Sequence, residues 1–256
     1  MIDSHTHLND PRLEPEIESL LARMREAGVT GAIVVGYDVP SSRKAIELAR
    51  RYPEPLRASV GMHPHDAKDL DAAALDELER LAREPEVVAY GEIGLDFHYD
   101  NSPRDVQREA FGRQLEVAKR LGLPVIIHER SASEEALAII EAHDARKLGG
   151  TWHCCSVEPE FAAGITPDFF VGIAGWISFP KADNIRALAR AVPLERLLIE
   201  TDCPYLTPVP YRGKRNEPAY VRLVAESLAE VKRVSVAEVE RVTSENVGRA
   251  FPGWGR

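Results

Sequence analysis

Short apolar runs alternate with longer amphipathic stretches along most of the chain. The apolar runs cover residues 31–35, 57–61, 87–90, 124–127, 169–173 and 197–199, with shorter candidates at Ile2 and at 150–152. Continuous apolarity is typical of parallel strands that are covered on both faces. Residues 15–27, 42–51, 72–83 and 106–121 lie between these runs and have a helical period. The pattern therefore predicts eight strand–helix units.

The number of these units and the chain length together predict the fold. Eight βα units in 256 residues favour a closed (β/α)8 TIM barrel over an open sheet. Two helix-like stretches follow between residues 217 and 250 without a strand, and the second opens with a Ser-x-x-Glu capping box at Ser235. No repeat or flexible linker divides the chain. We expect a single α/β domain over residues 1–256, with extra C-terminal helices.

The composition narrows the range of partners and locations. The net charge of −9, from 32 basic and 41 acidic residues, argues against a protein that coats duplex nucleic acid through bulk charge. Divalent cations in an acidic pocket would still permit a phosphate substrate. No run approaches the ~18 apolar residues of a membrane span, and no signal peptide or disulfide framework is evident. We expect a cytoplasmic protein that does not enter membranes.

Histidines and carboxylates fall where the predicted strands end. The positions are His5, His7, His63, His65, His128 and His153, with Glu92, Glu200 and Asp202. The C-terminal ends of barrel strands are where the active sites of this fold are built. Because strand side chains repeat every two residues, His5 and His7 share a face and can bind one ion. The pattern therefore predicts a catalytic metal centre.

The predicted ligands divide between two metal ions. One ion takes three residues, His5, His7 and Asp202, and the second takes His128 and His153. Glu92 comes from the strand between the two sets and bridges the ions, which lie ~3.5–4 Å apart in two-metal hydrolytic sites. Water fills the remaining positions, as catalysis requires.

Two further residues have alternative interpretations. Glu200 shares a face with Asp202, and it either orients a ligand histidine or is a carboxylate of the barrel interior or the rim that pairs with an arginine. His63 is assigned to the substrate rather than to a metal ion, and the alternative is a structural histidine.

Several motifs resemble those of one family, and the resemblance runs over the whole chain. They are the segments at residues 5–7, 61–65, 91–96, 124–128 and 153–154, and the long stretch at 200–218. The chain resembles the TatD family of metal-dependent deoxyribonucleases. The resemblance implies an amidohydrolase-type barrel that hydrolyses phosphodiester bonds in DNA, often from the 3′ end. It also implies metal ligands at His5, His7, Glu92, His128, His153 and Asp202, and a phosphate contact at His63.

The expected reaction is hydrolysis by a metal-activated water. Asp202 takes the proton of this water, and Glu92 and His63 are the other catalytic residues. Basic residues that suit the flanking phosphates are Lys181, Arg130, Arg212, Lys214 and Arg215, although each singly also suits a solvated rim charge. The expected substrate is DNA, single-stranded or at its 3′ ends, and we expect a monomer. Departures from the family pattern at residues 155–157 and at Pro180 fall on predicted rim loops and bear on substrate details.

The metal and the reaction each leave alternatives open. Imidazole ligands favour Zn²⁺, Mn²⁺, Fe²⁺ or Ni²⁺, whereas the resemblance implies Mg²⁺. The predicted cofactor is two divalent ions of Mg²⁺, Mn²⁺ or Zn²⁺. One alternative function is a hydrolase of another ester, lactone or amide on the same barrel. Such relatives commonly bridge their metals with a modified lysine, and no lysine lies near Glu92. A non-catalytic nucleic-acid-binding module is opposed by the complete ligand set and the negative charge.

Overall fold

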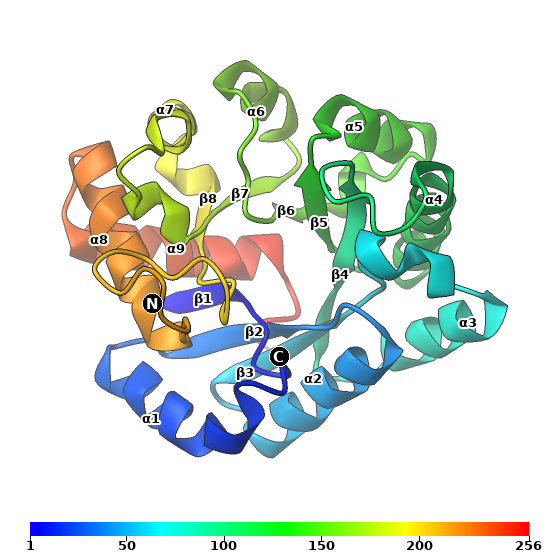
Figure 1. The fold of residues 1–256 in the computed structure, drawn as a ribbon, viewed down its shortest axis with the longest axis horizontal. Coiled ribbons are helices and arrows are strands. Elements are labelled where there is room, and N and C mark those ends of the chain that lie inside the picture. Colours follow the sequence, from blue (N-terminus) through cyan, green and yellow to red (C-terminus); the bar gives the residue numbers. More distant parts are fainter. Residues whose placement is uncertain (256) are drawn as a thin grey trace.

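The computed structural model describes residues 1–255, and in this range eight strands form one parallel sheet whose order follows the chain (Figure 1). The strands are β1 (Ile2–Thr6), β2 (Gly31–Val35), β3 (Leu56–Val60), β4 (Val87–Asp96), β5 (Val125–Arg130), β6 (Gly150–Trp152), β7 (Phe170–Ile173) and β8 (Leu197–Ile199). A parallel bridge from Thr6 to Cys203 links β1 to the segment after β8. The predicted (β/α)8 barrel is confirmed.

Helices surround the strands on the outside of the barrel (Figure 1). They are α1 (Ile17–Glu26), α2 (Val39–Arg51), α3 (Ala72–Leu81), α4 (Arg104–Leu121), α5 (Ser133–Ala142), α6 (Pro159–Ile165), α7 (Asp183–Ala191), α8 (Val221–Lys232) and α9 (Val236–Ala250). Short 3-10 segments cover Glu14–Glu16, Pro64–Asp69, Arg146–Leu148, Gly175–Ser178, Leu194–Arg196 and Pro218–Tyr220. The two C-terminal helices follow β8 without a strand, as predicted. The Ser235 hydroxyl accepts a hydrogen bond from the Glu238 N–H at 3.1 Å and caps α9.

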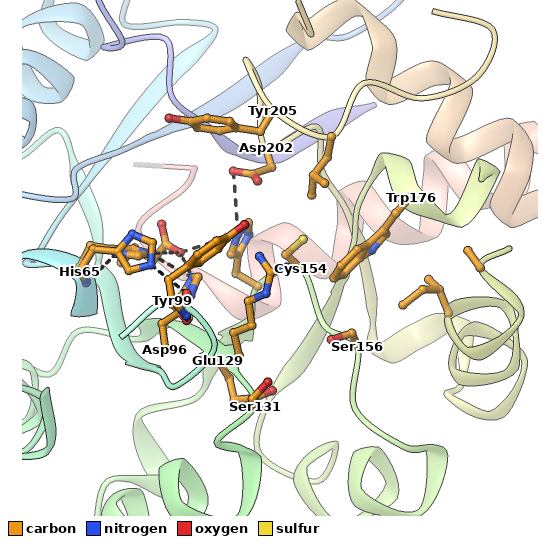
Figure 2. Close-up of a pocket in the computed structure, with 18 of the residues that line it drawn as sticks. His65, Asp96, Tyr99, Glu129, Ser131, Cys154, Ser156, Trp176, Asp202 and Tyr205 are labelled. Carbon is orange, nitrogen blue, oxygen red and sulfur yellow. Dashed lines mark hydrogen bonds and ion pairs between the residues drawn. The ribbon is translucent and has the colours of Figure 1, made fainter. Parts of the chain in front are cut away.

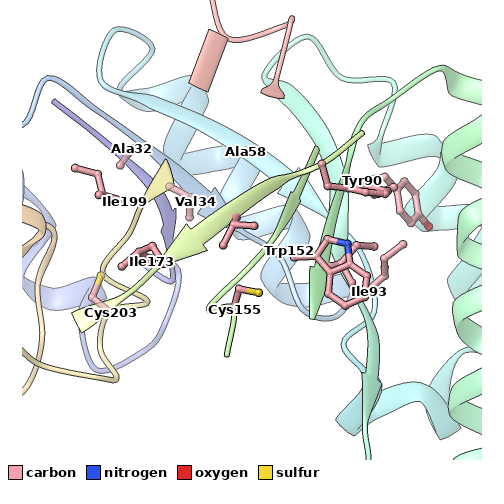
Figure 3. Close-up of a cluster of buried hydrophobic side chains, with 14 of the residues drawn as sticks. Ala32, Val34, Ala58, Tyr90, Ile93, Trp152, Cys155, Ile173, Ile199 and Cys203 are labelled. Carbon is pink, nitrogen blue, oxygen red and sulfur yellow. The ribbon is translucent and has the colours of Figure 1, made fainter. Parts of the chain in front are cut away.

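Two apolar clusters hold the barrel and its helices together. The larger joins the strands to the outer helices, and Figure 3 shows part of it around Tyr90, Trp152 and Ile173. The smaller draws mainly on the first residues of strands from different sides of the barrel, such as Ile2 and Ile126, together with Phe251 after α9. The end of α9 therefore closes the barrel at the N-terminal ends of its strands. The C-terminal ends remain available for a site.

Strand β4 continues to Asp96, well beyond the apolar run that predicted it. It pairs with β5 over this extension, with Gly94 opposite His128. An added Cβ atom at Gly94, whose φ is +146°, would lie 2.0 Å from the carbonyl oxygen of His128, so only glycine permits this approach. The extension carries Glu92 and Asp96 to the same edge as His128. Within residues 1–255, no helix has the length and apolarity to cross a membrane.

Candidate metal centre

A pocket of about 1010 Å³ opens at the C-terminal ends of the strands, and polar side chains from six strands converge at its base. The residues brought together are His5 and His7 from β1, His63 after β3, Glu92 from β4, His128 from β5, His153 after β6, and Glu200 and Asp202 after β8. Figure 2 shows Asp96 and His65 on one side of this group and Asp202 on another. The predicted site residues thus lie in one cluster at the edge where this fold places its active sites.

Glu92 lies at the centre of the cluster and directs its two oxygens to different histidines. Its Oε2 atom lies 3.4 Å from His5 Nε2 and 3.8 Å from His7 Nε2. Its Oε1 atom lies 2.7 Å from His128 Nδ1 and 3.7 Å from His153 Nε2. The carboxylate is buried, with 3% of its side chain exposed. This arrangement suits one carboxylate that spans two cations.

Asp202 approaches the same cluster from the segment after β8. Its Oδ1 atom lies 3.3 Å from His7 Nε2 and 3.9 Å from both His5 Nε2 and His153 Nε2. The residue has a φ of +54°, in the left-handed region that non-glycine residues rarely adopt. Its N–H donates to the His5 carbonyl at 3.0 Å, which holds this backbone conformation against β1. Local backbone strain of this kind is typical of functional sites.

Acceptor atoms outside the cluster contact three of the four predicted ligand histidines, which are His7, His128 and His153, whereas His5 Nδ1 is buried without a hydrogen-bond partner among residues 1–255. His7 Nδ1 lies 3.2 Å from the Val35 carbonyl oxygen, so Nε2 is left with a lone pair for the cluster. His153 Nδ1 lies 3.0 Å from Glu200 Oε1, and His128 Nε2 lies 3.2 Å from Asp96 Oδ2. Such partners fix the tautomer and the ring orientation of metal-binding histidines.

Glu200 and Asp96 are therefore the two carboxylates that contact the outer ring nitrogens of His153 and His128. Glu200 is fully buried and accepts hydrogen bonds from Ser4 Oγ at 3.2 Å and the Cys154 N–H at 2.5 Å. Within residues 1–255 it pairs with no arginine, which favours the interpretation that it orients His153. Asp96 also contacts His65 Nε2 at 2.9 Å and was given no role from the sequence. It shares a strand face with Glu92 at a spacing of four, and this period-two signal would have identified it.

We predict that Asp96→Asn lowers the affinity for divalent metal by about 10- to 100-fold, the usual effect of removing such a partner. The amide can donate to His128 Nε2, which would reverse the tautomer and turn the lone pair away from Glu92. Titration of metal-free protein with Zn²⁺ measures the effect. Asp100→Asn is the matched control because Asp100 is exposed and pairs with Arg104. An unchanged affinity in Asp96→Asn would contradict this role.

The charges of the cluster fit a cation. Burial lowers the pKa of His153, but Glu200 and Glu92 outweigh burial and raise it to about 10. Burial also lowers the pKa of His128, but hydrogen bonds to Asp96 and Glu92 raise it to about 9. Burial raises the pKa of Glu92, yet the histidines around it hold that pKa well below its usual range. The carboxylates thus draw positive charge into the cluster, and divalent metal would displace the imidazole protons.

His63 differs from the other histidines in its hydrogen bonding. Its Nδ1 atom accepts from the His65 N–H at 3.1 Å, so the neutral ring carries its proton on Nε2. Burial lowers the pKa of His63 well below its usual value, which favours this neutral form. The Nε2 atom lies 3.2 Å from His128 Nδ1 and 3.6 Å from Glu92 Oε1, so His63 directs a donor, rather than a lone pair, to the cluster.

Compact groups of candidate ligand atoms are formed by His5, His7 and Glu92, by His5, His153 and Asp202, and by His63, Glu92 and His128. His153 lies between the two predicted sets, because its Nε2 atom is 3.7 Å from Glu92 Oε1, the oxygen that also faces His128, and 3.9 Å from Asp202 Oδ1. The predicted division of the ligands between two ions stays a prediction. The six proposed ligands remain a prediction, and the cluster offers enough nitrogen and oxygen atoms to hold two ions.

The basic residues predicted to contact substrate divide between two locations. Arg130, Lys181 and Arg212 line the pocket. Lys214 instead lies over the Tyr211 ring, and Arg215 pairs with Glu16, so neither is part of the pocket lining. The aromatic residues of the lining, which the sequence analysis left without a role, include Tyr99, Trp176 and Tyr205 (Figure 2).

Known proteins resemble this chain over nearly its whole length. The metal-dependent hydrolase YabD of Bacillus subtilis is 39% identical over 252 residues, with 98% of each chain covered. The 3′-5′ ssDNA/RNA exonuclease TatD of Edwardsiella piscicida is 35% identical over 257 residues, with 98% of this chain and 99% of that protein covered. The crystal structure of YjjV, a TatD homologue from Escherichia coli, superposes with a TM-score of 0.93 at 30% identity and 98% coverage of both chains.

Residues 2–252 match the family model described as TatD related DNase. The prediction of a metal-dependent hydrolase of this type on a (β/α)8 barrel is confirmed by the family, the relatives and the fold. The chain belongs to the TatD-related DNase family.

Proposed function

We propose that this chain is a two-metal nuclease that hydrolyses phosphodiester bonds of single-stranded DNA from the 3′ end. The observation that carries the proposal is the division of Glu92 between two groups of histidines at the base of the pocket. A relative that covers this chain is named a 3′-5′ ssDNA/RNA exonuclease, which supports the choice of substrate and direction. Magnesium, manganese and zinc are the candidate ions.

His5, His7, Glu92, His128, His153 and Asp202 would hold the metal ions. When bound, divalent cations supply a Lewis acid that lowers the pKa of water and offsets the charge of a phosphate. Burial raises the pKa of Asp202, but its contacts with His7 and His153 lower it overall, so the carboxylate is ionised at neutral pH. Asp202 then accepts the proton of the attacking water. The Nε2–H of His63 donates to a non-bridging oxygen of the phosphate.

Three cations at the pocket lining support a phosphate polymer as substrate. Arg130, Lys181 and Arg212 line the pocket and are exposed, and within the described part of the chain none of them forms an ion pair. Many other arginines are paired with carboxylates, as Arg23 is with Glu217. Unpaired cations beside an anionic cluster are free to bind flanking phosphates.

We predict that Lys181→Ala weakens binding of a single-stranded oligonucleotide and makes it less dependent on salt. Removal of one phosphate contact reduces the slope of log affinity against log salt concentration by about 0.7 for a single strand. Fluorescence anisotropy with the inactive Asp202→Asn variant as background measures this slope. Lys147→Ala is the control, because Lys147 precedes β6 at the opposite end of the barrel. Equal slopes in both lysine variants would remove Lys181 from the substrate site.

Comparison of substrate classes tests the proposed function. Metal-loaded protein is incubated with single-stranded DNA, duplex DNA, and a panel of lactones, carboxylic esters and amides. We expect turnover of DNA above the other classes, because the lining cations match repeated phosphates, and of single-stranded above duplex DNA, because a relative is named an ssDNA/RNA exonuclease. Turnover of a lactone or amide without turnover of DNA would support the alternative hydrolase instead. A metal-loaded protein that binds DNA without cleaving it would support the binding module.

A further inference from the structure

Exposed large hydrophobic side chains gather at one edge of the molecule. Within residues 1–255 they are Tyr99, Tyr205, Val209 and Tyr211, which are 38–55% exposed. All four lie on the loops that follow β4 and β8, at the C-terminal edge of the barrel. Single exposed apolar residues are ordinary, so the informative ones are Tyr99 and Tyr205, which also line the pocket that holds the metal centre.

Two of these tyrosines line the pocket on different sides of the metal centre. The Tyr99 ring lies 5.5 Å from the ring of His65, and the Tyr205 ring lies 6.2 Å from the ring of His7. Figure 2 shows Tyr205 beside Asp202, and Tyr99 beside His65 and Asp96. A phosphate bound at the cluster would therefore have an exposed aromatic ring on either side.

A guanidinium group also stacks on one face of each of these tyrosine rings. The Arg130 guanidinium carbon lies 4.7 Å from the centre of the Tyr99 ring, and that of Arg12 lies 4.7 Å from the centre of the Tyr205 ring. Tyr99 remains 55% exposed and Tyr205 remains 49% exposed despite these contacts. Arg12 also forms an ion pair with Asp10, with its Nη2 atom 2.6 Å from Asp10 Oδ2, whereas Arg130 forms no ion pair within residues 1–255. Both tyrosines therefore offer an open aromatic surface to an unpaired nucleotide, and Tyr99 offers an unpaired positive charge as well.

We propose that Tyr99 and Tyr205, each with its stacked arginine, bind the two nucleobases that flank the scissile phosphate of a single-stranded nucleic acid. The inference rests on the proposed nuclease function and names the contacts that select its substrate. Stacking uses the face of a base and is tolerant of sequence, because every base has such a face. Base pairs in a duplex keep their faces stacked on their neighbours, so these two contacts favour an unpaired strand.

Oligonucleotides with a stable abasic nucleotide at the terminal or the penultimate 3′ position test the inference. Loss of one stacked base is expected to lower kcat/KM of the wild-type protein by about 5- to 150-fold. Tyr99→Ala and Tyr205→Ala are each expected to lose a similar factor on the intact strand. Each variant should then be insensitive to the abasic nucleotide at one position and remain sensitive at the other.

Two kinds of control separate stacking from general damage. Tyr99→Phe and Tyr205→Phe keep the ring and should retain wild-type sensitivity to both abasic positions. Tyr211→Ala removes another exposed tyrosine of the same edge, which stacks on Tyr220 at 4.7 Å and lies outside the pocket lining, and should leave kcat/KM unchanged. The metal centre of an alanine variant is intact if the variant cleaves one of the abasic strands as fast as the wild-type protein cleaves that same strand.

The outcomes distinguish this inference from the proposed function on which it rests. Position-specific loss of sensitivity in the two alanine variants supports stacking at Tyr99 and Tyr205. Cleavage of intact and abasic strands at equal rates by the wild type, or unchanged sensitivity in both alanine variants, overturns the inference and leaves the nuclease standing. A metal-loaded wild type that cleaves no strand at all overturns the proposed function itself.

Discussion

Asp202→Asn is expected to lower kcat for single-stranded DNA by about 10²- to 10⁴-fold, the range of a lost general base. Asparagine has nearly the same shape and keeps an oxygen that can face a cation, but it cannot accept a proton at neutral pH. Metal binding should therefore survive better than turnover. Single-turnover rates and the metal content of the reloaded variant measure the two effects separately.

Asp66→Asn is the matched control for this substitution. Asp66 is a carboxylate that lines the same pocket, but it belongs to none of the groups that could hold a metal ion. Its variant should keep most of the wild-type rate. Wild-type turnover in metal-loaded Asp202→Asn would remove Asp202 from the proton transfer.

Glu92→Gln is expected to lower kcat by about 10²- to 10⁴-fold, because one metal ion contributes several kcal/mol of charge stabilisation to the transition state. An amide has only one oxygen, and its nitrogen would face one of the two histidine groups. The number of tightly bound ions should fall from two to one or none. Elemental analysis after reloading and gel filtration gives this stoichiometry directly.

Glu129→Gln is the control for the effect of charge at a neighbouring strand end. Glu129 also lines the pocket, but it accepts a hydrogen bond from the Ala132 N–H at 2.6 Å within its own loop. We expect two bound ions in this variant. If Glu92→Gln also retained two ions and full activity, the bridging role of Glu92 would be wrong.

The order of the strands and the location of the site followed from the sequence because both depend on local patterns. Apolar runs marked the strands, and the histidines at their ends marked the edge on which the site is built. The end of β4 was missed because its last residues are not an apolar run. Gly94 permits that extension, and its requirement comes from the backbone of β5, which lies more than thirty residues away.

The contacts within the site were harder to predict than its members. The sequence predicts Glu92 as a bridge and pairs His153 with His128, and both assignments remain predictions. The structure adds a contact that the strand order did not indicate, because the His153 ring stacks on the His5 ring with centres 3.5 Å apart. Strand order alone does not fix which side chains meet across a barrel, because tilt and stagger decide it. No sequence pattern marked Tyr99 and Tyr205 as site residues, because the exposure of their side chains depends on how the surrounding loops fold.

We propose that this cluster binds divalent metal and that the bound metal is required for hydrolysis of single-stranded DNA. Metal-free protein, prepared by chelation, is incubated with 5′-labelled and 3′-labelled single-stranded and duplex DNA before and after addition of Mg²⁺, Mn²⁺ or Zn²⁺. We predict no cleavage without metal. After metal is added, the 3′ label should be released as mononucleotides and the 5′-labelled strand should shorten stepwise. Cleavage that is equally fast without metal, or no cleavage with any of the three ions, would contradict a metal-dependent nuclease.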